Sequence, residues 1–405
     1  MDLFEKCRGF LSDPAIARAM GYPMNPAQAR EKGIYPFFIP LDQTEGTEVT
    51  IGGRRLTMIG SNNYLGLTTD PRVRAAAIDA LKTYGPSCTG SRFLNGTLAL
   101  HNELERRLAT FVGKEAALVF STGYQTNLGT LSALIGRGDL IIGDKENHAS
   151  LVDGARLALG KFLRFRHNDM ADLESLLRTV PKTAGCLVVV DGVFSMSGEL
   201  ASLPEIAALC KRHGVRLMVD DAHGMGTVGG GRGTAAHYGL TDDVDLIMAT
   251  FSKSFASIGG FIAGEEAAIH WIQHTARSLI FSASLPAPNV AAALASLEIM
   301  EREPDRVDRV NAIAQRMRTD LRAMGYDVGR GETPIVPIVI GDQLKTMCLW
   351  KGLFDAGVYT NVAMPPAVPP GGALLRTSYM ATHTDAQMDR VLEIFERVGK
   401  REGVL

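Results

Sequence analysis

The chain has 405 residues, of which 46% are hydrophobic and 21% charged, and its formal net charge is −2 at pH 7 with a pI near 6.5. This is the composition of a globular protein with room for two or three domains, and it lacks the excess of positive charge that would indicate nucleic-acid binding. No apolar run has the length of a membrane span or the layout of a signal peptide, and five scattered cysteines predict reduced thiols in a cytoplasmic protein without a metal site.

Residues 1–55 are predicted to form an N-terminal arm, with a β-hairpin near residues 49–56. Beyond the arm, short apolar runs alternate with helical patterns, which is typical of a mostly parallel sheet covered by helices. The predicted strands are 116–120, 139–142, 162–166, 187–191, 215–220, 245–251 and 260–263, and the predicted helices include 98–112, 124–135, 170–179 and 204–213. Residues 56–288 are therefore assigned to a large α/β domain.

After residue 288 the pattern changes. One long helix is predicted over 288–324, followed by alternating apolar residues at 333–339. A last helix is predicted to start at Thr384, where the sequence Thr-Asp-Ala-Gln matches a capping box. Residues 289–405 are thus predicted to be a smaller α+β domain, which contains a stiff, proline-rich loop at 365–372.

Several polar side chains follow the predicted strands of the large domain. Parallel sheets bind ligands at the C-terminal ends of their strands, so this edge is the predicted functional site. The residues at this edge are His148, Asp191, Asp220, His223 and Lys253.

The segment 121–125 lies between a strand and a helix, where free backbone N–H groups and a positive helix end suit a phosphate group. Gly123 would allow close approach, and Tyr124 could contact a ring. His148 could lie flat on such a ring, or it could be a helix cap or a surface histidine. Ser195 could bond a ring oxygen or be an ordinary turn serine.

Lys253 follows the apolar run 246–252, which is predicted to be a buried strand. A lysine at the inner end of a core strand is unusual unless its amine is neutral or covalently used, as in a Schiff-base lysine. The alternative is a lysine that extends along the strand edge to water.

Asp220 ends the preceding predicted strand, and a carboxylate there could hold the proton on a pyridine nitrogen. His223 could reach the phenolic oxygen of the same ring. The alternative makes Asp220 a helix cap and His223 a surface histidine. The combination with Lys253 favours pyridoxal phosphate.

Two further motifs each allow two interpretations. Arg376 follows an apolar strand pattern and could clamp a carboxylate with its bidentate guanidinium, or form a structural ion pair. Residues 224–229 match G-x-G-x-x-G, but they run into more glycine rather than into a helix, which argues against a dinucleotide site.

The stretch 250–259, Thr-Phe-Ser-Lys-Ser-Phe-Ala-Ser-Ile-Gly, resembles the cofactor-attachment signature of the α-oxoamine synthase family, whose members are fold-type I pyridoxal-phosphate enzymes. The resemblance continues from about residue 61 to 384 through further motifs in the same order, at 61–66, 90–97, 120–124, 147–150, 219–223 and 281–286. It implies a fold-type I α/β transferase.

The resemblance also implies the role of each site residue. Lys253 would hold the cofactor and later move the α-proton, Asp220 would pair with the pyridine nitrogen, and His148 would stack over the ring. His223 and Ser195 would bond the phenolic oxygen. The phosphate would be surrounded by Gly123, Tyr124, Thr250 and Ser252, with Ser282 reaching in from the neighbouring subunit of a homodimer. Asn63 and Arg376 would bind the carboxylate of the amino acid.

Motifs 90–97 and 365–369 most resemble those of family members that condense L-serine with a long-chain acyl thioester, carried by coenzyme A or an acyl carrier protein, in the first step of sphingolipid synthesis. One departure is Val368, where those members commonly have threonine. The alternatives are an 8-amino-7-oxononanoate synthase, a 2-amino-3-ketobutyrate ligase or a non-catalytic partner subunit. A long-chain product also suggests peripheral membrane contact, which a flotation assay without liposome binding would contradict.

Overall fold

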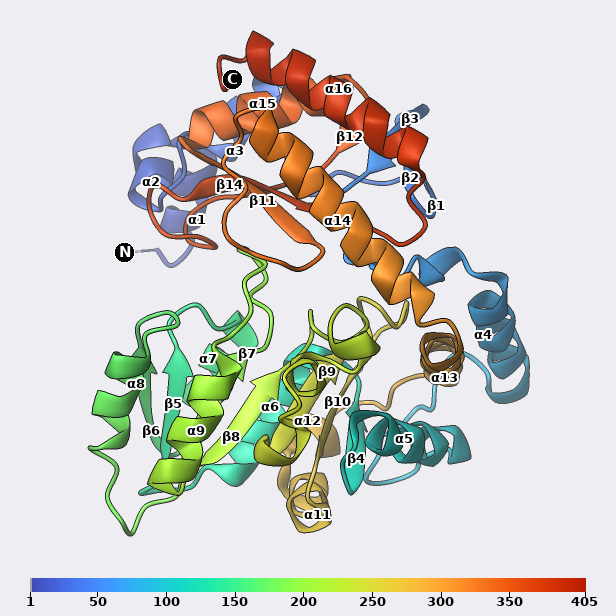
Figure 1. Cartoon of the computed structure of the whole chain (residues 1–405), viewed down its shortest axis with the longest axis vertical. Helices are drawn as coiled ribbons and strands as arrows, with labels where there is room; N and C mark the ends of the chain where they lie inside the picture. The colour runs from blue at the N-terminus through green and yellow to red at the C-terminus, as the bar shows by residue number, and fades with distance from the viewer. Residues whose placement is uncertain (1) are drawn as a thin grey trace. The chain divides into compact units, whose positions relative to one another are not determined.

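Seven strands form the main sheet of the structure, a computed structural model that describes residues 2–405 (Figure 1). Their order is β4-β10-β9-β8-β7-β5-β6. All neighbours are parallel except β10, which is antiparallel to both β4 and β9. The strands are β4 (Ala116–Phe120), β5 (Leu140–Asp144), β6 (Lys161–Phe165), β7 (Cys186–Asp191), β8 (Arg216–Asp220), β9 (Leu246–Thr250) and β10 (Gly260–Gly264). The prediction of a mostly parallel sheet is confirmed.

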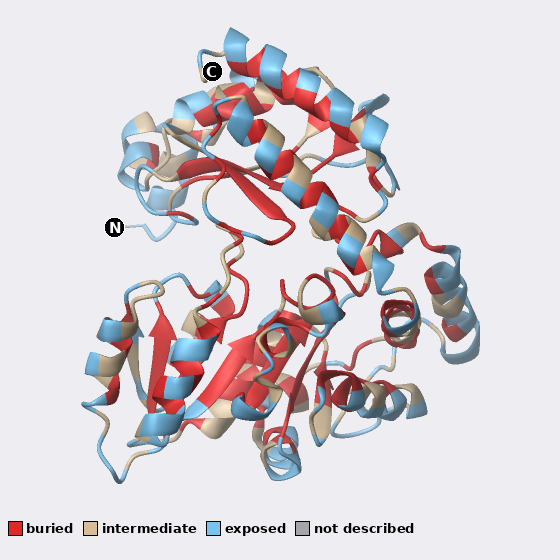
Figure 2. Ribbon diagram, viewed as in Figure 1, coloured by how far each residue is buried: buried red, intermediate tan, exposed pale blue. Residues whose placement is uncertain are grey.

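Alternate residues of these strands face two different helix layers. Leu118, Ile141 and Met248 pack with residues of α6, α7, α11 and α12 in one buried cluster. Val119, Ile142 and Ile247 pack with residues of α5, α8, α9 and α13 in another. Figure 2 shows the central strands of the sheet buried between helices whose outer faces are exposed, whereas the edge strand β6 is buried only at Phe165. Burial on both faces explains why the strands are continuous apolar runs in the sequence.

The helices of this layered unit include all four that the sequence predicts between strands. They are α4 (Pro71–Tyr84), α5 (Ala99–Val112), α6 (Gly123–Leu134), α7 (Ala149–Leu157), α8 (Met170–Leu177), α9 (Leu203–His213), α10 (Thr234–His237), α11 (Glu266–Thr275), α12 (Arg277–Ile280) and α13 (Ala287–Arg302), with 3-10 turns at Leu67–Thr69, Gly229–Gly231 and Thr241–Asp243. Helix α7 escapes prediction because it is short and contains Gly154. A side chain there would approach the Asn127 carbonyl oxygen of α6 to 2.9 Å, so glycine permits the close packing of α6 and α7.

The prediction of a single helix over residues 288–324 is wrong. The chain forms α13 and a separate helix, α14 (Asp305–Ala323), and the break falls at Glu303 and Pro304. Proline lacks the N–H that would continue the ladder of hydrogen bonds and pushes the preceding residue away from helical geometry.

A second unit contains both chain ends. Its two sheets have the orders β1-β2-β3-β12 and β11-β14-β13. Its elements are α1 (Glu5–Ser12), α2 (Pro14–Ala19), α3 (Pro26–Glu31), β1 (Gln43–Glu45), β2 (Glu48–Ile51), β3 (Arg54–Met58), most of α14, β11 (Ile335–Gly341), α15 (Gln343–Asp355), β12 (Val358–Tyr359), β13 (Asn361–Ala363), β14 (Ala373–Ser378) and α16 (Asp385–Arg401). Strands β2 and β3 form the predicted hairpin. The capping box of α16 is also present, with Thr384 and Gln387 bonding each other's backbone N–H.

The limits of the two units differ from the predicted ranges 1–55, 56–288 and 289–405. The small unit consists of the chain up to Asn62, Met196–Gly198 and Val310–Leu405, and the large unit consists of Asn63–Ser195 and Glu199–Arg309. The predicted arm joins the C-terminal region because β3 pairs with β12. Helix α13 stays in the large unit because Ala287 and Ala291 pack against Ala80 of α4.

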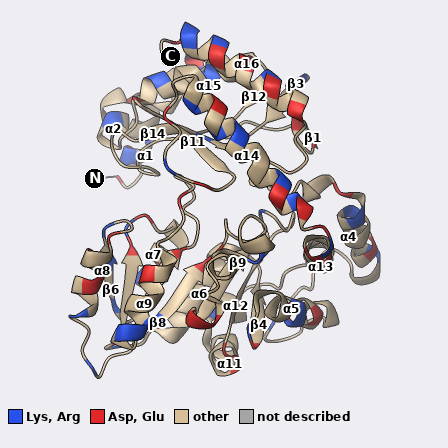
Figure 3. Cartoon of the chain, in the orientation of Figure 1, with Lys and Arg blue, Asp and Glu red and all other residues tan. Residues whose placement is uncertain are grey.

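Charged residues of both signs are mixed along helices such as α14 and α16 (Figure 3). Among residues 2–405, none of the helices combines the length and hydropathy needed to cross a membrane.

Candidate active site

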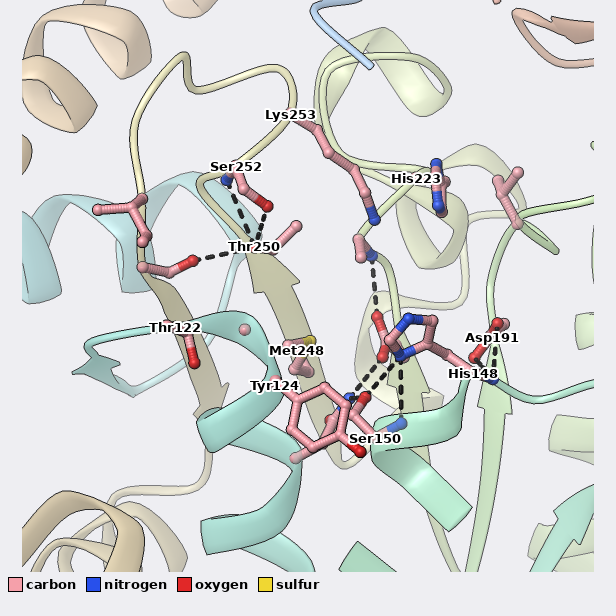
Figure 4. A pocket seen from close by; sticks show the side chains of 17 residues that line it. Thr122, Tyr124, His148, Ser150, Asp191, His223, Met248, Thr250, Ser252 and Lys253 are labelled. Atoms are coloured by element: carbon pink, nitrogen blue, oxygen red, sulfur yellow. Dashed lines mark hydrogen bonds between the residues drawn. The ribbon is translucent and has the colours of Figure 1, made fainter. Parts of the chain in front are cut away.

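A cavity of about 350 Å³ opens where β4, β5, β7, β8 and β9 end in the large unit. Figure 4 shows its side chains, which point inward from these strand ends and from the start of α6. Its lining includes eight of the predicted site residues, namely Gly123, Tyr124, His148, Asp220, His223, Thr250, Ser252 and Lys253. The sheet topology thus brings together predicted site residues that are up to 130 positions apart in the sequence, from Gly123 to Lys253.

One end of the cavity is the N-terminus of α6. Thr122 caps this helix by accepting the Gln125 N–H at 3.1 Å, so the preceding amides of the first turn lack intrahelical acceptors. A side chain at Gly123 would lie 2.7 Å from Thr250 Oγ1, which explains the glycine. Thr250 Oγ1 and Ser252 Oγ lie 2.9 Å apart beside the helix end. This arrangement of amides and hydroxyls suits a phosphate group.

Asp220 lies at the opposite end and is 4% exposed. Its carboxylate accepts the Asn127 side-chain N–H at 2.6 Å and the Ala222 backbone N–H at 3.1 Å. Asn127 also donates to Ser150 Oγ at 2.8 Å, and Ser150 Oγ lies 2.7 Å from His148 Nδ1. Asp220 and His148 are therefore linked through two side chains that orient both.

The bonds of His148 determine its protonation. Nδ1 accepts the backbone N–H of Ser150 at 3.2 Å, so this nitrogen carries no hydrogen and the ring is neutral. The pKa of His148 is lowered, because protein rather than water surrounds much of the ring and Lys253 adds positive charge, whereas Asp220 acts in the opposite direction. A neutral imidazole can stack flat on an aromatic ring without carrying charge into the site.

Two further carboxylates lie next to Asp220. Asp191 accepts the His148 backbone N–H, and burial, reinforced by the charge of Asp220, raises the pKa of Asp191 well above its usual value. Asp221 points away from the cavity lining and bonds the backbone and side chain of Thr234, and burial raises its pKa to about 6. Asp220 and Asp191 therefore both line the cavity, whereas Asp221 does not.

Sequence reasoning missed three supporting residues. Tyr64, fully buried, places its hydroxyl 2.7 Å from Nδ1 of His223, and Asn127 and Ser150 connect Asp220 to His148. Asn127 is four positions after Gly123 on α6, so helical spacing could have placed it on the cavity face. No comparable signal marked Ser150.

Lys253 follows a buried strand, as the sequence predicts, but it is less buried than expected. It is half-buried in the turn after β9, three residues beyond the strand end at Thr250. The turn is anchored by Phe251 and Phe255, which are both fully buried. The amine of Lys253 points into the cavity (Figure 4). This position leaves the amine accessible for chemistry.

Four predicted residues lie outside the cavity lining. Ser195 follows Val193, which does line it, and Ser282 Oγ accepts from the Gln125 side chain at 3.1 Å. Asn63 is buried and donates to Thr68 Oγ1 at 2.8 Å. Arg376 is buried in the middle of β14 in the small unit. The roles of these four stay predictions.

The donor set fits an aromatic cofactor with a phosphate group. It offers a helix end for the phosphate, a neutral imidazole for the ring, a carboxylate for a ring nitrogen and an amine for an aldehyde. Within residues 2–405, no group of three or more His, Cys, Asp or Glu side chains is arranged to hold a metal ion.

Comparison with known proteins agrees with this fit. The family model described as aminotransferase class I and II matches residues 54–395. The chain is 48% identical to the serine palmitoyltransferase of Sphingobacterium spiritivorum, over 92% of this chain and 94% of that one. It is 39% identical to the 8-amino-7-oxononanoate synthase of Treponema denticola, over 93% and 96%. The chain also superposes on the structure of a lysine-to-alanine variant of serine palmitoyltransferase from S. paucimobilis, solved with a bound PLP–myriocin aldimine. The superposition covers 100% of each chain, with a TM-score of 0.94 and 38% sequence identity.

Proposed function

Because the chain belongs to the class I and II aminotransferase family, and within it to the serine palmitoyltransferases of the α-oxoamine synthase group, we propose that it condenses L-serine with a long-chain acyl thioester. A carbon–carbon bond forms between the α-carbon of serine and the acyl carbonyl carbon. Carbon dioxide and the free thiol leave, and the product is the 3-keto long-chain base 3-ketosphinganine. Pyridoxal 5′-phosphate is the cofactor.

One observation carries this proposal: Lys253, Asp220 and His148 line a single cavity that ends at the N-terminus of α6. A non-catalytic partner subunit would not need an accessible lysine amine between a buried carboxylate and a helix end. The cavity also has the size of a small-molecule site, which is typically ~300–1,000 Å³.

We assign the chemistry to these residues as follows. When bound, the cofactor supplies an electron sink for the charge that develops as a bond to the α-carbon of serine breaks. Lys253 Nζ attaches the cofactor and then takes the α-proton as general base. Asp220, oriented by Asn127, holds a proton on the ring nitrogen.

Two histidines orient the cofactor ring in this assignment. His148 stacks on one face, held by Ser150, and His223 bonds the phenolic oxygen, held by the buried Tyr64 hydroxyl. Gly123, Tyr124, Thr250 and Ser252 enclose the phosphate. Ser195, Asn63 and Arg376 are proposed to contact ring and substrate, although they lie outside the cavity lining.

The choice of amino acid is the first thing to measure. We expect L-serine to shift the visible absorption band of the cofactor-loaded protein at a lower concentration than glycine or L-alanine, with D-serine as the control. Preference for alanine or glycine would identify a sibling synthase with the same mechanism. Val368 is the residue that points toward this outcome, because the serine-using members of the family commonly have threonine there. No cofactor band after addition of pyridoxal phosphate would contradict the catalytic assignment.

We also propose a homodimer whose sites are shared. Large apolar side chains are exposed on the large unit, including Leu94, Leu157 and Phe281, and a dimer interface would bury such side chains. Ser282, next to Phe281, is the residue proposed to act in the partner's site. Light scattering of the loaded enzyme is expected to give twice the 43.6 kDa chain mass, and an active species at the mass of one chain would contradict the proposal.

Cytoplasmic location and peripheral membrane contact stay predictions. The product class motivates the membrane prediction, and liposome flotation of the purified protein tests it.

A further inference from the structure

His167 lies in the turn after β6 and has carboxylates on both sides. Its Nδ1 is 3.1 Å from Asp144 Oδ1, and its Nε2 is 3.1 Å from Glu199 Oε2 and 3.8 Å from Glu146 Oε2. Ionised carboxylates only accept hydrogen bonds, so both ring nitrogens must carry hydrogen for these contacts to be made together. The geometry therefore requires an imidazolium.

The two acidic partners belong to two different loops of the cavity. Asp144 ends β5 and starts the turn to His148, and its carboxylate also accepts the N–H groups of Glu146 and Asn168. In the same turn, Asn147 exchanges hydrogen bonds with Val189 and Asp191 of β7, and His148 donates its N–H to Asp191. A change at Asp144 would be transmitted directly to the position of His148.

Glu199 belongs to the loop 192–202 between β7 and α9. The loop folds back on itself, with the Phe194 N–H bonding the Glu199 carbonyl at 2.9 Å and the Ala201 N–H bonding the Gly192 carbonyl at 3.0 Å. Val193 lines the cavity, whereas the next residue, Phe194, is buried and packs edge-on against the His167 ring, with centroids 4.4 Å apart. The pair of His167 and Glu199 thus supports the cavity wall from behind.

We propose that His167, as an imidazolium between Asp144 and Glu199, is a positioning residue that joins the His148 turn to the loop that carries Val193 into the wall of the active cavity. It touches neither the cavity lining nor the proposed reacting atoms. Only the kinetic test of this inference depends on the proposed function.

The charges around His167 favour the same protonation state. Asp144, Glu199 and Glu146 face the ring, and the adjacent Arg166 pairs with Asp169 instead. Although burial lowers the pKa of His167, these carboxylates outweigh it and raise the pKa to about 9. The folded-state pKa thus lies above the 6.5 of a histidine in an unfolded chain, so the stabilisation is complete below pH 6.5 and is lost as the pH rises through about 9.

The test compares H167Q, which removes the charge and can bond both carboxylates only poorly, with H167R, which keeps a cation with several donors. H270Q, at an exposed position of α11, is the matched control. We expect H167Q to lower kcat roughly 10- to 100-fold, with a smaller change in KM for serine, because small displacements of site residues cost this much. We expect H167R to recover part of the loss and H270Q to change nothing.

A second readout does not depend on turnover. The visible circular dichroism of the bound cofactor should weaken in H167Q, because His148 and Val193 no longer fix the surroundings of the ring. The advantage of wild type over H167Q in melting temperature should disappear as the pH is raised through about 9. If wild type fails to condense serine with a thioester, the proposed function fails, while these two measurements still test the role of His167.

An H167Q protein with kcat within about twofold of wild type and an unchanged dichroism band would overturn the proposal, even if it melted earlier. E199Q provides a second test should H167Q not fold, since it removes the charge at the other end of the pair. The double variant H167Q/E199Q is expected to be no worse than H167Q alone, because both changes remove one interaction. Additive losses would overturn the proposed pairing.

Discussion

Replacing Lys253 with alanine is expected to reduce the condensation of serine at least ~1,000-fold, because the same amine is assigned both the attachment of the cofactor and the transfer of the α-proton. The half-buried turn after β9 tolerates alanine, since its anchors are Phe251 and Phe255. The phosphate end of the cavity is unchanged in this variant. K253A should therefore still bind pyridoxal phosphate, without the visible band of the covalently attached cofactor.

Lys82 supplies the control for this experiment, because it is an exposed lysine on α4. K82A should keep wild-type rates and spectrum. Full activity in K253A would rule out the assignment of the chemistry. If K253A fails to fold, K253R serves as the test, because it keeps a cation but lacks the amine, and it should be equally inactive.

Replacing Asp220 with asparagine is expected to lower kcat roughly 100- to 1,000-fold with little effect on stability, because the change removes a negative charge that acts on the reacting ring. The asparagine oxygen can still accept from Asn127, and the charge that raises the pKa of Asp191 disappears. Kinetics and thermal unfolding of the loaded protein measure the two effects separately.

The adjacent carboxylate gives a matched control with the same chemical change. Asp221 bonds Thr234 and does not line the cavity, so D221N should keep most of the activity and change mainly the stability. If D220N and D221N lose equal activity, Asp220 acts through the fold rather than on the cofactor.

The sheet could be predicted well from the sequence, because strands that are buried on both faces are continuous apolar runs. Such a run is a local pattern and can be recognised without knowledge of the tertiary contacts. The same strand ends located His148, Asp220 and Lys253, since ionisable residues stand out after such runs. The resemblance of short motifs then supplied the cofactor and reaction class.

The remaining features depend on contacts that no local pattern encodes. The bond between Tyr64 and His223 joins residues 159 positions apart, and Asn127 finds Asp220 across 93 positions. The apolar pattern continues beyond Pro304 and therefore predicts one long helix. The chain nevertheless breaks there, because proline lacks the backbone N–H that the helix needs. The unexpected link of β3 to β12 likewise arises from strand pairing between distant segments.

Strand β10 stands between the two ends of the proposed cofactor site. Its first residue, Gly260, pairs with Phe120, which precedes the phosphate end, and with Thr250, which precedes Lys253. A side chain at Gly260 would come within 2.7 Å of the Gly123 Cα, so glycine is needed where β10 passes the start of α6. A slip of one residue would reverse every side chain of β10 between the two helix layers, so burial on both faces specifies its register. The spacing between the ends of β4 and β9, which lead into α6 and Lys253, is therefore set by the backbone pairing of a strand whose own residues do not line the cavity.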